Sequence, residues 1–314
     1  MCCPCRVIGH GVTVLLSLLA AVFLAIGIVV RQRATLDVPA EHGVSAVMVL
    51  TLIRRPLWWA GTAAAVAGFV FQALALANGS LLLVQPILVS ALLFALPLSA
   101  RLAHRRVTRA EWAWALLLTA ALAVFVVLAK PSPGDYEASL QTSAIVAVVC
   151  TVAVLACVVV ASRSADWRRA VLLAVAVGVL FGVVAVLTKL FMHVLTHEGL
   201  VAVLVTPVPY LLVILGVIAV LLQQSAFHAG SLQTSVPTML TLEPVIAVVL
   251  GAVVLGEHLD VGRLDAVVLA ISTLAMVAGT IALGRDEGAL EERMAAPADA
   301  EPAGPVGQAA SGTE

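Results

Sequence analysis

The stretch Gln72-Ala-Leu-Ala-Leu-Ala-Asn-Gly-Ser-Leu-Leu-Leu-Val-Gln-Pro86 has a counterpart 151 residues later, Gln223-Gln-Ser-Ala-Phe-His-Ala-Gly-Ser-Leu-Gln-Thr-Ser-Val-Pro237. The positions that agree are Gln72 with Gln223, Ala75 with Ala226, Gly79-Ser80-Leu81 with Gly230-Ser231-Leu232, and Pro86 with Pro237. In a helical membrane protein, a weak internal repeat with paired helix breakers is typical of alternating-access transporters. It predicts two related halves with a site where they meet.

The composition is that of an integral membrane protein. Hydrophobic residues make up 62% of the chain and charged residues only 11%, and the mean hydropathy is +1.12. A soluble domain carries about 25% charged residues. The basic residues are spread among loops and do not gather on one surface, which excludes nucleic-acid binding.

The apolar stretches predict nine spans, each near the ~20 residues that a bilayer requires. They cover residues 12–30, 57–77, 80–99, 111–129, 141–161, 170–190, 203–228, 232–255 and 264–283. Gly79 and Gly230 are predicted to allow tight reversals, and Ser80 and Ser231 to cap the helices that follow.

This reading gives an all-α fold of two inverted four-helix repeats plus a linking helix. Its segments are a short external N-terminus (1–11), the first repeat (12–129), the linking helix and its loops (130–169), the second repeat (170–284) and an acidic tail (285–314). The tail is rich in Ala, Pro and Gly and carries seven acidic residues, so we expect it to be disordered.

Lys and Arg counts orient the chain. The loops on the N-terminal side hold four basic residues, and the opposite side holds the other thirteen. The positive-inside bias therefore predicts a plasma-membrane protein with its N-terminus outside and its C-terminus in the cytoplasm. A homodimer is compatible with the sequence.

The run Leu242-Glu-Pro-Val-Ile-Ala-Val-Val-Leu-Gly-Ala-Val-Val-Leu-Gly-Glu257 resembles the penultimate-helix signature of EamA-like members of the drug/metabolite transporter superfamily. The first half is similar to the NIPA-type magnesium-transporter branch, in Leu57-Trp-Trp-Ala-Gly61 and Val84-Gln-Pro86. Gly182-Val-Val-Ala-Val-Leu-Thr-Lys189 resembles the sixth helix of that branch. The resemblance implies a helical transporter fold over about residues 10–284.

Glu243 is the sharpest candidate for a site residue. Counted from Ser231 at ~1.5 Å per residue, it lies about 18 Å along its helix, near the middle of the hydrocarbon layer. A carboxylate there must be paired, protonated or facing a wet cavity. It is predicted to bind a cationic group of the substrate or a coupling proton; the structural alternative is a protonated acid bonded to a neighbouring helix.

Two prolines lie six residues after the predicted capping serines. Each of Pro86 and Pro237 frees a backbone carbonyl and favours a kink. Because the kink recurs in both halves, we predict a shared mechanical role for the hinge set Gly79, Pro86, Gly230 and Pro237.

A polar set surrounds the two hairpins. Buried amides in lipid need partners, so these side chains should point inward and form a pathway for a polar solute, although interhelical hydrogen bonding explains any single one equally well. The set consists of Gln72, Asn78, Gln85, Gln223, Gln224, His228 and Gln233.

Three further features lie on the predicted outer side. Lys189 is a candidate contact in an outer vestibule, with snorkelling to the interface as the alternative. His193 and His197 have the spacing of metal ligands on a helix, but we place them in a short outer loop without further obvious ligands and expect no metal site. Glu257 is expected to cap a helix or form a salt bridge.

The sequence predicts a secondary transporter or exporter of a small polar metabolite. It contains no enzyme motif, no phosphate-binding loop and no sign of a cofactor, so any energy must come from an ion or substrate gradient. Two alternatives stay open at this point. One is magnesium or divalent-cation transport, and the other is a flippase or a non-transporting partner in envelope assembly.

Overall fold

The computed structural model describes residues 3–36, 56–102, 106–129, 131–132, 140–164, 166–229, 232–259 and 261–295. The helices are α1 (Cys3–Leu36), α3 (Pro56–Asn78), α4 (Leu81–Leu88), α5 (Ala91–Leu102), α6 (Arg109–Leu128), α7 (Leu140–Ser162), α8 (Asp166–His197), α9 (Leu200–Val205), α10 (Val208–Ala229), α11 (Leu232–Val254) and α12 (Arg263–Ala295). The strands in these ranges, β1 (Pro131–Ser132) and β2 (His258–Leu259), pair antiparallel.

Eight stretches of the described helices are long and apolar enough to cross a membrane. They are His10–Val30, Pro56–Asn78, Leu81–Arg101, Arg109–Leu128, Gln141–Ser162, Arg168–His197, Ser235–Val254 and Arg263–Asp286. The chain is therefore an all-α, multi-pass membrane protein. α10 has a shorter apolar stretch, Val208–Gln223, so the count of nine spans stays a prediction.

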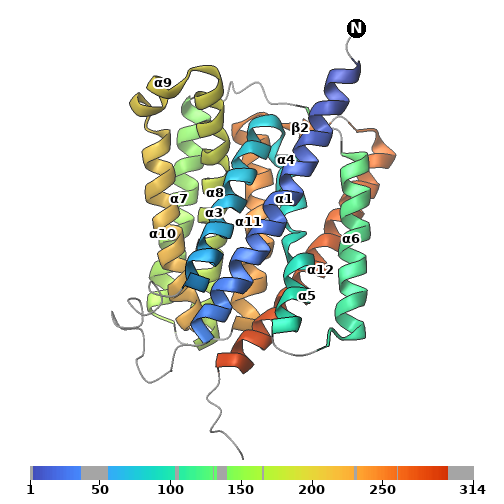
Figure 1. The fold of residues 1–314 in the computed structure, drawn as a ribbon. Coiled ribbons are helices and arrows are strands. Elements are labelled where there is room, and N and C mark those ends of the chain that lie inside the picture. Colours follow the sequence, from blue (N-terminus) through green and yellow to red (C-terminus); the bar gives the residue numbers. More distant parts are fainter. Residues whose placement is uncertain are drawn as a thin grey trace, which may run out of the picture.

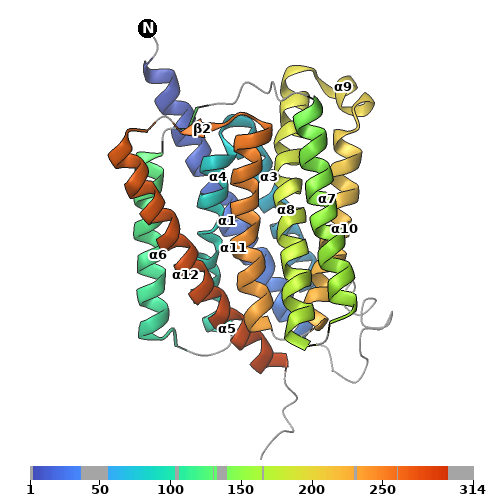
Figure 2. The same cartoon turned by 180° about the vertical axis from the view of Figure 1, so that it is seen from behind.

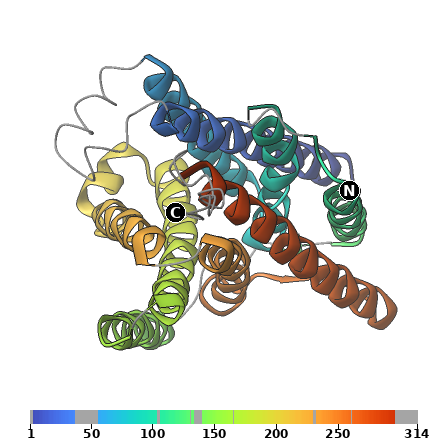
Figure 3. The ribbon, with the colours of Figure 1, turned by 90° about the horizontal axis from the view of Figure 1, so that it is seen from below.

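The helices stand roughly side by side in one bundle with two distinct ends (Figures 1 and 2). The upper end, at the top of Figure 1, carries the start of α1, the α3–α4 turn, the β1–β2 pair and α9. The lower end carries the α5–α6 connection and the end of α12. α11 packs between α8 and α12, and Figure 3, seen from below, shows it at the edge of the bundle between these two helices.

The third predicted span, 80–99, is not one helix. It is divided into α4 and α5 at Val89 and Ser90. There the backbone makes shorter-range bonds, from the Val89 N–H to the Pro86 carbonyl (3.3 Å) and from the Ser90 N–H to the Ile87 carbonyl (2.9 Å). Pro86 removes the backbone hydrogen bond to the Leu82 carbonyl and weakens the turn before it, and the shorter-range bonds follow one turn later.

Two other predicted spans have different boundaries in the structure. The span 203–228 is interrupted at Thr206 and Pro207, where proline cannot continue the α9 ladder, so α10 begins only at Val208. α8 runs two turns past residue 190 and ends before Gly199, whose φ of 84° suits a left-handed cap.

α12 also continues beyond its predicted end. It runs to Ala295, into the segment 285–314 for which composition predicts disorder. Its last turns contain Ala, Leu, Glu and Arg, which are good helix formers. At the other end of the chain, α1 begins at Cys3, inside the predicted external terminus 1–11.

Glycines let two helix pairs pack closely. Between α1 and α3, a Cβ added at Gly27 would lie 2.7 Å from the Ala65 backbone nitrogen. Between α8 and α11, a Cβ at Gly182 would lie 2.6 Å from Ile246 Cγ2. Small residues at helix contacts are the usual means of close association in a bilayer, where the hydrophobic effect does not drive helices together.

We predict that Gly182→Ala destabilises the protein by about 1–3 kcal/mol, because the added methyl group has no room beside β-branched Ile246 and the Ala247 backbone. The matched control is Gly216→Ala in α10, where nothing lies within 4 Å of the added Cβ. That change should be neutral or stabilise by up to about 1 kcal/mol. Thermal unfolding of both purified variants checks the prediction, and equal midpoints would contradict it.

Candidate functional site

A buried group of charged and polar side chains joins four helices at the upper end of the bundle. This upper polar cluster consists of Ser80, Lys189 and Glu257, which are 5%, 5% and 2% exposed. Lys189 Nζ lies 3.0 Å from Glu257 Oε1. An ion pair so far from water must satisfy its remaining hydrogen-bonding groups within the protein.

Glu257 caps the start of α4. Its Oε2 accepts hydrogen bonds from Ser80 Oγ (2.7 Å) and from the Leu82 N–H (3.2 Å). Its Oε1 accepts one from the Leu81 N–H (3.1 Å). A carboxylate at a helix N-terminus satisfies free N–H groups and complements the helix dipole. Ser80 Oγ also accepts from the Leu82 N–H, which confirms the predicted serine cap.

The Leu-Gly-Glu step after α11 places Glu257 at this position. Gly256 has a φ of 68°, a left-handed conformation that suits glycine and turns the chain back after the helix. The Glu257 N–H donates to the Gly251 carbonyl (3.2 Å), which fixes the turn. Gly251 also leaves space for the carboxylate, since a Cβ there would lie 3.2 Å from Glu257 Oε2.

Lys189 of α8 reaches the end of α3 as well as Glu257. Its ammonium group donates to the carbonyls of Gly79 and Leu76, the second at 3.4 Å. Carbonyls at a helix C-terminus attract a cation. The ammonium group thus has three acceptors within the protein, one for each of its N–H groups. The predicted contact of Lys189 with a substrate in an outer vestibule stays a prediction.

Position 79 requires glycine because of close packing, and not because of an unusual backbone angle. Its φ is not positive, unlike those of Gly199 and Gly256. A Cβ at Gly79 would overlap the side chain of Thr13 on α1. The close approach of α1 to the α3–α4 turn therefore requires glycine here.

Glu243 lies lower on α11, on the side that faces the other helices. Residues 243, 247 and 250 share one side of the helix. Ala247 and Leu250 are buried in an apolar cluster formed by α3, α4, α8 and α11. Glu243 is half-buried at the lower edge of this cluster, and the described part of the chain gives its carboxylate no hydrogen-bond or ion-pair partner.

The break between α4 and α5 lies at about the level of Glu243. Gly251 touches Leu81, since a Cβ at Gly251 would lie 3.2 Å from the Leu81 Cβ, and α4 descends from this contact while α11 rises to it (Figure 1). At about 1.5 Å per residue, Glu243 lies about 12 Å and Ser90 about 13 Å below it. Both are thus near the middle of a ~30 Å hydrocarbon layer.

Two polar groups near the break have no hydrogen-bond partner among the described residues. Gln85 is 2% exposed and its Nε2 makes no hydrogen bond, and the Ser90 hydroxyl is also buried without one. Such groups are costly unless something bonds them. We call Gln85, Ser90 and Glu243 the central polar set.

The other residues of the predicted polar set are more dispersed. Gln72 is buried on α3, and Gln223 is half-buried on α10. Within the described ranges α10 packs mainly on α8 and not closely on α3 or α4, so Gln223 and Gln72 are not brought together. The side chains of Gln224, His228 and Gln233, and all of Gly230, lie outside the described residues.

The two prolines of the predicted hinge have different surroundings. The helix breaks just after Pro86, whereas α11 passes Pro237 without interruption. Pro237 packs on α12, where a Cβ at Gly284 would lie 3.1 Å from it. The sequence match therefore does not translate into the same helix geometry in both halves.

His193 and His197 lie on the last turns of α8, not in a loop as predicted. Their ring centroids are 4.5 Å apart. Within the described residues no group of three or more His, Cys, Asp or Glu side chains could hold a metal ion.

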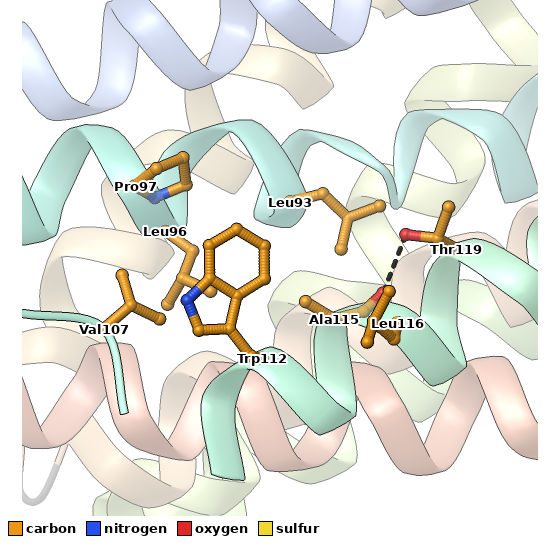
Figure 4. A pocket seen from close by; sticks show the side chains of 8 residues that line it. All are labelled: Leu93, Leu96, Pro97, Val107, Trp112, Ala115, Leu116 and Thr119. Carbon is orange, nitrogen blue, oxygen red and sulfur yellow. Dashed lines mark hydrogen bonds between the residues drawn. The ribbon is translucent and has the colours of Figure 1, made fainter. Parts of the chain in front are cut away.

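A small pocket of about 100 Å³ between α5 and α6 is apolar (Figure 4). Trp112, Leu96 and Pro97 form much of its wall, and the hydroxyl of Thr119 donates to the Ala115 carbonyl (2.7 Å) of its own helix. The indole N–H of Trp112 is the polar group that its lining offers, so the pocket suits an apolar group better than a polar solute.

Comparison with known proteins shows the family. Over 272 residues the chain is 36% identical to an uncharacterized protein of Corynebacterium glutamicum, and the match covers 87% of this chain and 94% of that protein. The chain belongs to the family of this corynebacterial protein. No established family profile matches the chain, and no solved structure matches it.

Proposed function

We propose that the protein is a secondary transporter of a small polar metabolite that works by alternating access and belongs to the drug/metabolite transporter superfamily. It lies in the plasma membrane with the upper end outside, and α10 is its ninth span. The observation that carries the proposal is the Glu243 carboxylate, which has no partner among the described residues and lies at about the depth at which the neighbouring α4 gives way to α5. Discontinuous helices at this depth are where transporters of this kind bind substrates.

The packing supports two inverted repeats. The first comprises α1, α3, α4 with α5, and α6; the second comprises α8, α10, α11 and α12; and α7 links them. α1 packs on α3 as α8 packs on α10. Across the proposed halves α4 packs on α11 and α6 on α12, so two of the four pairs of counterpart helices meet. Contacts between counterparts are what a pseudo-twofold axis passing between these pairs would produce.

Polar contacts join the two halves at the upper end, and lower down α5 of the first half packs on α12 of the second. The upper polar cluster ties α3 and α4 to α8 and the end of α11. Lower down, α5 has no close packing on α11 among the described residues. In our proposal the two halves separate at the lower end, between α5 and α11, to expose the central polar set to the cytoplasm.

The central polar set indicates the substrate class. It offers an amide, a hydroxyl and one carboxylate in an otherwise apolar interface. This suits a polar solute with a cationic group or with several hydrogen-bond donors. Magnesium instead prefers a shell of oxygen ligands supplied by one or two carboxylates and water.

The test is uptake by proteoliposomes of purified protein, with a panel of polar metabolites and with magnesium, each with and without a pH gradient. We expect uptake of a metabolite above that of protein-free liposomes. Uptake of magnesium alone would replace the proposal by cation transport. Absence of all uptake by folded protein in both gradients would overturn the transporter and leave the flippase or partner role.

A further inference from the structure

A second cavity lies on the opposite side of α11 from Glu243. It has a volume of about 330 Å³, at the lower end of the usual range of about 300–1,000 Å³ for ligand pockets. The helices that form it, α8, α11 and α12, stand side by side in Figure 2. It is lined by Val175, Pro237, Thr238, Thr241, Leu242, Val245, Ile281 and Arg285.

This α11–α12 groove, defined by these eight residues, faces the bilayer. Val245 is 40% exposed, and Val249 and Val253, one and two turns above it on the same side of α11, are 51% and 48% exposed. Side chains exposed within a membrane span contact acyl chains. The groove therefore continues into the lipid-facing surface of α11 and is not part of the central polar set.

The hydroxyl of Thr241 is buried in this groove and has no hydrogen-bond partner in the part of the chain that the structure describes. Threonines elsewhere in the membrane helices donate to the carbonyl four residues earlier, as Thr119, Thr188 and Thr273 do at 2.7–2.8 Å. Thr241 does not. A hydroxyl in hydrocarbon needs a hydrogen bond, so Thr241 is available to an oxygen of a ligand.

Arg285 supplies a positive charge at the lower end of the groove. Its side chain is exposed, and among the described residues it has no hydrogen-bond or ion-pair partner. Gly284 touches Pro237, so Arg285 lies level with Pro237. Thr241 is one helical turn, about 6 Å, above that level.

The groups along the groove follow an order that is complementary to the parts of a glycerophospholipid. A cationic group lies at the lower end, a hydrogen-bond donor lies one turn deeper, and apolar Val245, Leu242 and Ile281 complete the walls. These levels match the phosphate, the glycerol ester and the acyl chain of a lipid whose head group is at the lower surface. A free anion would contact only the cationic group of Arg285 and would leave the Thr241 hydroxyl and the apolar walls without a partner.

We propose that the α11–α12 groove is a binding site for one anionic glycerophospholipid of the leaflet at the lower end. Arg285 binds its phosphate, the Thr241 hydroxyl donates to an ester carbonyl, and an acyl chain fills the groove. Anionic lipids are concentrated in the cytoplasmic leaflet, which agrees with the predicted orientation. The site stands independently of the transport proposal.

The test is lipid binding to delipidated protein in a non-ionic detergent, measured by native mass spectrometry and by the thermal unfolding midpoint. The added lipids are phosphatidylglycerol and phosphatidylcholine with the same acyl chains. The wild type should retain one phosphatidylglycerol in preference to phosphatidylcholine and unfold at a higher temperature with it. Equal retention of the two lipids would overturn the proposal.

Three variants locate the site. Arg285→Gln should weaken phosphatidylglycerol binding about fivefold, since one basic residue near a membrane surface contributes about 1 kcal/mol. Val245→Trp should weaken binding of either lipid because the indole fills the groove. The conservative Thr241→Val should reduce binding without affecting folding.

The matched control is Arg101→Gln, which removes another exposed lower-end arginine, in the last turn of α5. It should leave binding unchanged. Loss of binding in Arg101→Gln to the same extent as in Arg285→Gln would indicate a general charge effect and overturn the site. So would full stabilisation by glycerol phosphate alone, because that probe has no acyl chain.

Discussion

Replacing Glu257 by glutamine should lower the free energy of unfolding by about 3–5 kcal/mol, the range for breaking one partner of a buried ion pair. The change leaves the Lys189 ammonium group in an apolar surrounding without its counter-charge. It also turns one acceptor oxygen into an amide donor that faces the N–H groups of Leu81 and Leu82. The measurement is the unfolding midpoint of purified protein.

The matched control is Glu198→Gln, which removes an exposed carboxylate at the same end of the bundle. Exposed charges contribute little, so its effect should stay within about 0.5 kcal/mol. The double variant Lys189→Met with Glu257→Gln should recover part of the loss, because no unpaired charge then remains buried. If Glu257→Gln and Glu198→Gln unfold at the same temperature, the upper polar cluster does not stabilise the protein.

The helices themselves could be predicted because a bilayer leaves few choices. Long apolar runs must form helices of about 20 residues to satisfy their backbone groups. The Ser80 cap was also readable, since a serine directly before an apolar run is a local signal. These features depend only on neighbours in the sequence.

The interruption at Val89 and Ser90 was not readable in the same way. Pro86 shows that the ladder is weakened, but a proline inside a membrane helix is often tolerated with only a kink. Where the chain resumes its helix depends on packing against helices far away in the sequence. The identical spacing of Pro237, in an unbroken helix, shows that the local signal alone does not decide the outcome.

The pairing of Lys189 with Glu257 was missed for a related reason. The sequence predicts that Glu257 caps a helix or forms a salt bridge, and the structure confirms both. For Lys189 it predicts a contact in an outer vestibule or snorkelling, and it names no partner for either residue. Neither periodicity nor spacing says that α8 and the end of α11 meet at the α3–α4 turn. The pairing could have been predicted from charge alone. Lys189 and Glu257 have opposite charges at the same predicted depth beside the hydrocarbon layer, where such charges are expected to pair.

Glu243→Gln should reduce substrate uptake by about 10- to 100-fold while the protein stays folded. Glutamine has nearly the same size, and no described partner depends on the carboxylate, so the fold loses little. A hydrogen bond to a charged group contributes about 1.5–3 kcal/mol, which corresponds to this fall in uptake. The measurement is initial uptake in proteoliposomes, with Glu198→Gln as the control variant.

Whether Glu243→Gln loses gradient-driven uptake alone or also loses substrate exchange distinguishes the two ligands that Glu243 could bind. If the carboxylate carries the coupling proton, Glu243→Gln should abolish uptake driven by a pH gradient but retain exchange of labelled for unlabelled substrate, which needs no net proton movement. If it binds a cationic group of the substrate, both activities should fall together, and Glu243→Asp should retain more of each than glutamine does. Full uptake and exchange in Glu243→Gln would remove this carboxylate from the mechanism, and with it the observation that carries the proposed function.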